Sequence, residues 1–124
     1  MLDHIGLEVS DYSRSRAFYE RALEPVGLGV LMEPVPNVCG FGSPGDRKPF
    51  FWIGVRGRPS TGTHVAFEAR SRDVVDAFHS AAVAAGGQDN GAPGVREIYH
   101  PHYYGAYVLD PDGNNIEAVC HAPV

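Results

Sequence analysis

Two histidines and one glutamate have the residue types and the placement to bind a metal ion. His4 opens the stretch His-Ile-Gly-Leu-Glu-Val, His64 opens the similar stretch His-Val-Ala-Phe-Glu-Ala, and Glu117 lies between apolar neighbours near the C-terminus. A carboxylate inside an apolar strand needs a charged or metal partner if it is buried. Two imidazoles with one carboxylate form a three-ligand set that binds divalent iron, manganese or zinc and leaves positions open for water or substrate.

The segment that carries Glu117 is predicted to be a β-hairpin. Residues 110–115 read Asp-Pro-Asp-Gly-Asn-Asn, and apolar or β-branched residues flank them on both sides. This composition is typical of a tight turn between two strands. The prediction places Glu117 on the returning strand.

The chain contains an internal repeat with an offset of sixty residues. Identical residues recur at this offset, and the expected order of strand and helix recurs with them, which indicates a duplicated supersecondary unit. The matching pairs include His4 and His64, Glu8 and Glu68, Ala17 and Ala77, Phe18 and Phe78, Ala22 and Ala82, and Gly27 and Gly87.

Each repeat is predicted to be a βαβββ module, the first covering residues 1–60 and the second residues 61–124. Ser10 or Asp11 is expected to cap the first helix, and Ser71 is expected to cap the second. Turn-forming residues separate the strands, and the polar, glycine-rich stretch 88–94 is expected to be an exposed loop. The predicted strands cover residues 3–9, 28–33, 38–42, 49–55, 63–69, 95–100, 105–109 and 115–120.

Side-chain alternation predicts that the three metal-binding candidates face away from the helices. Successive side chains of a strand point to opposite faces of the sheet. His4 is therefore expected on the other face from Ile5, and Glu117 on the other face from Ile116. The apolar face of each strand is the one that a helix covers. If the sheets of the two modules curl around a common space, His4, His64 and Glu117 converge inside it.

These residues resemble the vicinal oxygen chelate superfamily, which includes glyoxalase I, extradiol dioxygenases, fosfomycin-modifying enzymes and bleomycin-resistance proteins. The resemblance is carried by the histidine that opens each module, by the 110–115 turn before Glu117, and by the stretch 99–104, Tyr-His-Pro-His-Tyr-Tyr. It implies an α+β fold in which two βαβββ modules form an eight-stranded open barrel, as one domain over residues 1–124. It also implies metal-assisted chemistry on neighbouring substrate oxygens.

The resemblance also implies where a fourth metal ligand would lie. In the glyoxalase pattern this ligand, usually acidic, comes from the last strand of the first module, and aligning residues 51–55 with 115–119 places Ile53 there. Isoleucine cannot bind a metal, so the three-ligand set looks like that of the extradiol dioxygenases. Phe51, Ile53 and Val55 are expected to form an apolar wall of the substrate pocket.

The aromatic stretch before the hairpin supplies candidate catalytic residues. Tyr107 lies ten residues before Glu117, similar to the tyrosine that precedes the metal-binding glutamate in extradiol dioxygenases. His100 and His102 are candidates for proton transfer, and the alternative is an exposed aromatic loop without a catalytic role. Two further residues of this stretch, Tyr103 and Tyr104, are expected to line the substrate pocket.

Composition limits the partners. The net charge is -5, with one lysine and scattered arginines, so nucleic acid is not expected as a partner. No apolar run approaches the length of about 18 residues that spans a bilayer, so no membrane partner is expected. Two cysteines give no disulfide framework, which favours the cytoplasm. We expect a homodimer, in which the modules pair within one chain or by exchange between two chains.

Two classes of function are compatible with these residues. The first is a metal-dependent lyase, isomerase or extradiol-type dioxygenase that acts on a small molecule with vicinal oxygens. The second is a non-catalytic protein of the bleomycin-resistance type, which sequesters a small ligand. Members of the second class generally lack the metal-binding residues, so the presence or absence of bound metal separates the two.

Overall fold

The computed structural model describes residues 1–124 as two four-stranded sheets, each accompanied by one helix. This confirms the predicted α+β class and the two βαβββ modules. No strand of one sheet pairs with a strand of the other, so the barrel is open. The first module contains β1 (Ile5–Glu8), α1 (Tyr12–Leu23), β2 (Gly29–Val35), β3 (Val38–Gly42) and β4 (Phe51–Gly54). The second contains β5 (His64–Glu68), α2 (Arg72–Ala84), β6 (Gln88–Val95), β7 (Tyr104–Leu109) and β8 (Asn115–Cys120).

Both sheets have the same topology. The strand order is β1-β4-β3-β2 in the first sheet and β5-β8-β7-β6 in the second. The first and last strands of each module pair in parallel, and the other pairs are antiparallel. The strand β1, which directly follows His4, and the strand β5, which begins with His64, are therefore both edge strands, and each lies next to the last strand of its own module.

The two helices begin where the sequence predicts. Asp11, rather than Ser10, caps α1 by accepting a hydrogen bond from the backbone N–H of Arg14 at 3.1 Å. Ser71 caps α2 through the backbone N–H of Val74 at 3.2 Å. These side chains satisfy backbone donors that have no partner within the helix. Neither helix has the length and apolar composition needed to cross a membrane.

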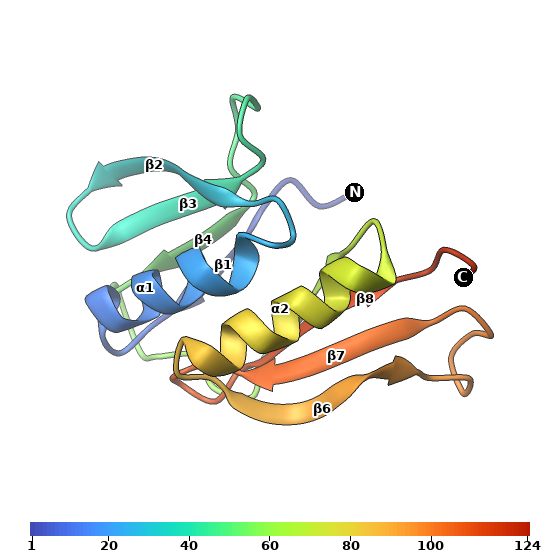
Figure 1. Ribbon diagram of the computed structural model, residues 1–124. Coiled ribbons are helices and arrows are strands. Elements are labelled where there is room, and N and C mark those ends of the chain that lie inside the picture. Colours follow the sequence, from blue (N-terminus) through green and yellow to red (C-terminus); the bar gives the residue numbers. More distant parts are fainter.

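One hydrophobic core connects the two modules. In Figure 1, α1 and α2 lie next to each other, and the outer strands β2 and β6 lie on opposite sides of the molecule. The ring centroids of Phe51 in β4 and Phe67 in β5 are 5.2 Å apart, and Tyr19 of α1 lies 5.1 Å from Phe51. The hydroxyl of Tyr19 also donates a hydrogen bond to Asp110, in the turn before β8. The first module thus holds the hairpin that carries Glu117.

The second module differs from the prediction at β6. Residues 88–95 form this strand, whereas the sequence predicted an exposed loop there, and residues 97–99 of the predicted strand 95–100 form a turn. Because β6 is an edge strand, it tolerates Pro93 and two glycines, and its register with β7 is irregular. The predicted strand 38–42 is present as β3.

Candidate metal-binding site

The structure brings His64 and Glu117 together on the face of the second sheet that points away from α2. Strands β5 and β8 are paired in parallel, with Ala66 opposite Glu117, so His64 lies two residues before that position on the same face. Nε2 of His64 lies 2.8 Å from Oε1 of Glu117. The Glu117 side chain is only 1% exposed, whereas the His64 side chain is 51% exposed. A buried carboxylate therefore has a solvent-accessible imidazole as its direct partner.

Two tyrosines surround the same carboxylate. Tyr103 donates its hydroxyl hydrogen to Oε2 of Glu117. Tyr107 is opposite Glu117 in the β7–β8 register, and its ring centroid is 6.2 Å from that of His64. Gly105 makes this arrangement possible, because a Cβ there would lie 3.2 Å from both the Glu117 carboxylate and the Tyr103 ring. Both oxygens of Glu117 thus have partners.

Both tyrosines are held in their protonated form. Burial raises the pKa of Tyr103, and the hydrogen bond to Glu117 raises it further. Burial also raises the pKa of Tyr107; a hydrogen bond with Tyr103 lowers it, but the charge of Glu117 raises it again. The two phenols are therefore hydrogen-bond donors at neutral pH.

His4 lies apart from this pair within one chain. Its Nδ1 is 2.6 Å from Oδ1 of the neighbouring Asp3. His4 borders a hollow of about 420 Å³ whose other lining residues all come from the first module. No group of three or more His, Cys, Asp or Glu side chains is arranged to hold a metal ion. Of the three predicted ligands, a single chain brings two together.

The register of the first sheet corrects the alignment used to find a fourth ligand. Gly6 is opposite Trp52 in the β1–β4 pair, just as Ala66 is opposite Glu117 in the β5–β8 pair. Trp52, not Ile53, therefore occupies the position that corresponds to Glu117. The indole lies near Gly40, where a Cβ would approach it to 2.9 Å. This position therefore offers no fourth ligand, because tryptophan does not bind metal either.

Four residues expected to line the substrate pocket lie elsewhere. Phe51 and Ile53 are 0% exposed and belong to the hydrophobic core, because they point to the helix side of β4. The hydroxyl of Tyr104 donates to Asp76 of α2 at 2.6 Å, which places its side chain on the helix side of β7. Val55 follows β4 and is 43% exposed.

His100 and His102 lie in the connection between β6 and β7. Nδ1 of His100 accepts a hydrogen bond from the backbone N–H of His102 at 3.0 Å. The His100 ring is 6.1 Å from that of His121, which in turn is 5.2 Å from the Tyr103 ring. Neither His100 nor His102 is hydrogen-bonded to His64 or Glu117. The His121 ring thus lies between the rings of His100 and Tyr103, and the His102 ring is 5.6 Å from that of His100.

Arg96 lies beside Tyr107, a position that sequence patterns did not indicate. Its guanidinium carbon lies 5.4 Å from the centroid of the Tyr107 ring. The sequence prediction placed Arg96 inside a strand, whereas it follows β6 and begins the turn before β7. The pairing of β6 with β7 is irregular between Gly91 and Gly94, and local sequence does not specify such a register.

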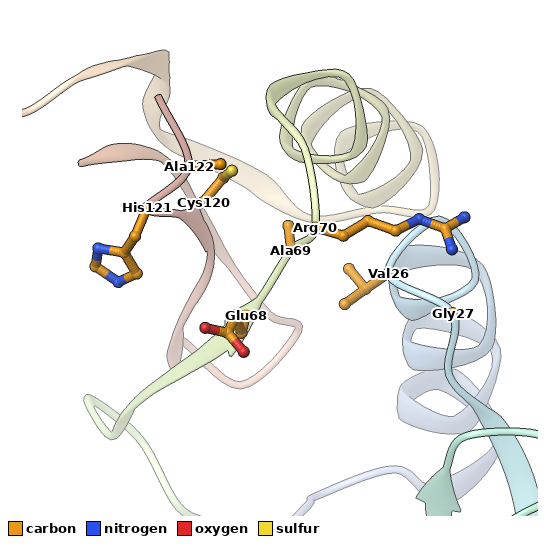
Figure 2. A pocket seen from close by; sticks show the side chains of 8 residues that line it. All are labelled: Val26, Gly27, Glu68, Ala69, Arg70, Cys120, His121 and Ala122. Carbon is orange, nitrogen blue, oxygen red and sulfur yellow. The ribbon is translucent and has the colours of Figure 1, made fainter. Parts of the chain in front are cut away.

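The largest cavity borders His64. It has a volume of about 540 Å³ and lies between the modules, with mostly apolar walls that include Ile5, Phe50 and Phe67. A second pocket, of about 350 Å³, lies near the ends of β5 and β8. Figure 2 shows that Arg70 in this second pocket extends away from Glu68 and His121. Its polar side chains do not converge, so the cavity at His64 is the better candidate for binding a small molecule.

Known proteins share this fold. A glyoxalase/bleomycin resistance protein from Albidiferax ferrireducens T118 is 33% identical, covers 99% of this chain and 99% of its own, and has a TM-score of 0.81. A glyoxalase/bleomycin resistance protein/dioxygenase family enzyme from Burkholderia phytofirmans PsJN is 18% identical, with coverages of 97% and 98% and a TM-score of 0.74.

A mutant of glyoxalase I from Zea mays has the same fold at 23% identity and a TM-score of 0.71; the match covers 95% of this chain and 46% of the maize chain. No curated protein matches the sequence. The sequence profile of one superfamily matches residues 1–118. From the profile and the relative at 33% identity, we conclude that the chain belongs to the Glyoxalase/Bleomycin resistance protein/Dioxygenase superfamily.

Proposed function

We propose that this protein is a divalent-metal-dependent enzyme that acts on a small, partly apolar molecule with vicinal oxygens. The contact between His64 and the buried Glu117 carries the proposal. A fully buried carboxylate is costly unless it is paired, and one of its two side-chain partners here is an imidazole that solvent can reach. Nitrogen and oxygen donors of this kind suit Fe²⁺, Mn²⁺ or Zn²⁺.

The third ligand in this proposal is His4 of a second copy of the chain. Within one chain His4 stays with Asp3, and three ligands do not assemble. Strands β1 and β5 each have an unpaired edge, and Leu2 and Phe50 beside the apolar cavity are 83% and 38% exposed. Unpaired strand edges and exposed apolar side chains favour association. A dimer that exchanges modules would bring His4 of one copy to His64 and Glu117 of the other.

The residues around Glu117 have distinct roles in this proposal. Tyr103 holds Oε2, which leaves Oε1 directed at His64. The Tyr107 hydroxyl is a protonated donor for a substrate oxygen, and His100 and His102 are the proposed proton carriers, because an imidazole can both accept and donate a proton. A bound divalent ion would supply Lewis-acid polarisation of the substrate oxygens. The apolar cavity beside His64 would hold the apolar part of the substrate.

A second candidate function is sequestration of a small apolar ligand without turnover. The 540 Å³ cavity favours it, because its walls are mostly apolar and His64 is one of few polar groups there. Such a binding protein needs no metal. The two functions therefore differ in metal dependence of ligand binding.

Metal binding by matched variants tests the first proposal. We expect the purified protein to bind Mn²⁺, Zn²⁺ or, without oxygen, Fe²⁺, measured by elemental analysis and by isothermal titration. Glu117→Gln keeps the shape and removes the charge, and it should weaken binding by more than about a hundredfold, beyond what loss of an outer-shell partner causes.

Glu68→Gln is the matched control, because Glu68 lies on the same face of the neighbouring strand and belongs to no ligand set. This variant should bind metal as the wild type does. Metal affinity that is unchanged by Glu117→Gln, or equally reduced by both substitutions, would exclude the proposed site. Ligand binding that needs no metal would then favour sequestration.

A further inference from the structure

We propose that Arg96 recognises an oxyanion on the substrate, a carboxylate or a phosphoryl group, and so selects anionic over neutral molecules. The inference rests on the proposed function, since it assigns a substrate class to the same site. It starts from the position of Arg96, whose guanidinium lies over the ring of Tyr107. Tyr107 is in turn the cross-strand neighbour of Glu117 and lies beside His64. One aromatic ring thus separates a cation from the two candidate ligands.

The backbone and side chain of Arg96 are both fixed. Its N–H donates to the carbonyl of Tyr103 at 2.7 Å, which ties it to the residue that contacts Glu117. Its Nη2 donates to the carbonyl of Ala92 at 2.7 Å. A guanidinium held by these contacts loses less conformational freedom when it binds a ligand.

Glycines provide the space that the guanidinium occupies. A Cβ at Gly94 would lie 3.0 Å from Nη1 of Arg96, and a Cβ at Gly91 would lie 3.4 Å from Nη2. Gly91 pairs with Tyr107 across the sheet, and a Cβ there would also approach the tyrosine ring to 2.7 Å. Side chains at these two positions would displace the arginine from Tyr107.

No carboxylate of the protein neutralises this arginine. Arg14, Arg16 and Arg56 each have an acidic partner within 4.0 Å, whereas Arg96 forms no ion pair. Of its five N–H donors, only one at Nη2 has a partner in the protein. The remaining donors form the planar fork that binds carboxylate or phosphoryl oxygens by two parallel hydrogen bonds. Their charge is available to a ligand at the metal-binding face.

The substrate class follows from this placement. A molecule whose vicinal oxygens lie at His64 and Glu117 would have its oxyanion at Arg96 and its apolar part in the cavity beside His64. Stacking of Arg96 on Tyr107 keeps the charge close to the vicinal oxygens. The preferred substrate is therefore a small diol, or an equivalent with adjacent oxygens, that carries one negative group.

Matched probes test this inference. The probes are 3,4-dihydroxybenzoate, 3,4-dihydroxyphenylphosphonate and the neutral 3,4-dihydroxybenzamide, titrated into Mn²⁺-loaded and metal-free protein by calorimetry. The wild type should bind at least one anion about tenfold or more tightly than the amide, as expected for a charge-assisted, two-pronged contact. The two anionic probes separate a carboxylate from a phosphoryl preference.

Arg96→Gln should remove this preference and leave the affinity for the amide unchanged, whereas Arg96→Lys should retain part of it. Arg21→Gln, on the exposed face of α1, makes the same change in net charge and should keep the full preference. Equal binding of anions and amide by the wild type, no binding of either anion, or an Arg96→Gln variant that still prefers anions would overturn the inference. So would an equal loss for the amide, which indicates a structural role.

The metal-free titrations separate this inference from the proposed function. If the protein binds no metal but still prefers the anions through Arg96, the metal-dependent function fails and the role of Arg96 stands. If metal and amide bind but the anions gain nothing, the proposed function stands and the role of Arg96 fails.

Discussion

Replacing Tyr103 with phenylalanine tests whether the Glu117 carboxylate depends on its tyrosine partner. Glu117 is 1% exposed and has two side-chain partners, His64 at Oε1 and the Tyr103 hydroxyl at Oε2. Tyr103→Phe keeps the ring and removes only the donor. One oxygen of a buried carboxylate then lacks its hydrogen bond, and part of its desolvation cost is no longer compensated.

The expected loss is about 1.5 to 3 kcal/mol of unfolding free energy, the range for a hydrogen bond to a charged group. Tyr104→Phe is the control, because the adjacent hydroxyl donates to the exposed Asp76. Its removal should cost no more than about 0.5 kcal/mol. Urea unfolding at one fixed protein concentration measures both values, and the midpoint of Tyr103→Phe should fall by about 1 M with an unchanged slope.

The contrast between the two variants decides the outcome. If Tyr103→Phe costs no more than Tyr104→Phe, Glu117 does not depend on this hydrogen bond, and the reasoning about its burial is refuted. A large loss in both variants would show that the aromatic segment as a whole is sensitive, again without a special role for the Tyr103 hydroxyl.

Three further predictions concern the fold that positions the site. Asp110→Asn should lower the unfolding free energy measured in urea by about 2 to 3 kcal/mol. The carboxylate accepts hydrogen bonds from the Tyr19 hydroxyl, from the Asn114 side chain and from two backbone N–H groups, and an amide cannot accept at both of its positions. An unchanged free energy would show that these bonds do not hold the turn. Gly87→Ala should destabilise by about 1 to 3 kcal/mol or more, because its Cβ would lie 2.4 Å from Val108 and 2.8 Å from Phe18; a neutral variant would contradict this close contact. Stability should fall as pH rises above about 10, because folding raises tyrosine pKa values above their ordinary 10.0 and the unfolded chain therefore releases these protons first. This contribution to stability is complete only below that pH, and Tyr19→Phe should make the fall of unfolding free energy with pH less steep. An unfolding free energy that is independent of pH between about 9 and 11 would contradict the prediction. The tyrosines with raised pKa values are Tyr12, Tyr19, Tyr103, Tyr104 and Tyr107.

Local sequence patterns predicted most of the fold because each pattern acts within one module. Period-two alternation indicated β5, whose Val65 and Phe67 are buried while its other side chains are exposed. The same alternation placed His64 and Glu117 on one face, where the structure brings them into contact. The edge strand β6 was not predicted, because its sequence lacks the alternation of apolar residues that a half-buried strand shows.

The register of the last strand of the first module could not be predicted from the repeat. The modules differ in length between their first and last strands, so the offset of sixty that relates the helices does not relate Trp52 to Glu117. A shift of one residue exchanges the two faces of a strand. This is why Phe51 and Ile53 lie in the core and Trp52 takes the open face.

The position of His4 relative to the other two candidates depends on how the two sheets are arranged. Alternation predicts the face of a strand on which a side chain lies, but it contains no information on the distance between separate sheets. The structure keeps His4 with Asp3 at the first sheet. A site completed by a second copy is therefore a prediction about assembly, which the sequence of one chain leaves open.

Metal binding by a mixed dimer tests the shared site most directly. His4→Ala and Glu117→Gln chains carry different affinity tags, are produced together, and are purified over both tags so that only mixed dimers remain. If His4 of one copy joins His64 and Glu117 of the other, each variant alone binds little metal, but the mixed dimer contains one intact site and binds about half as much metal as the wild type. A mixed dimer that binds no more metal than the two separate variants, or a failure of the chains to associate at all, would contradict the shared site.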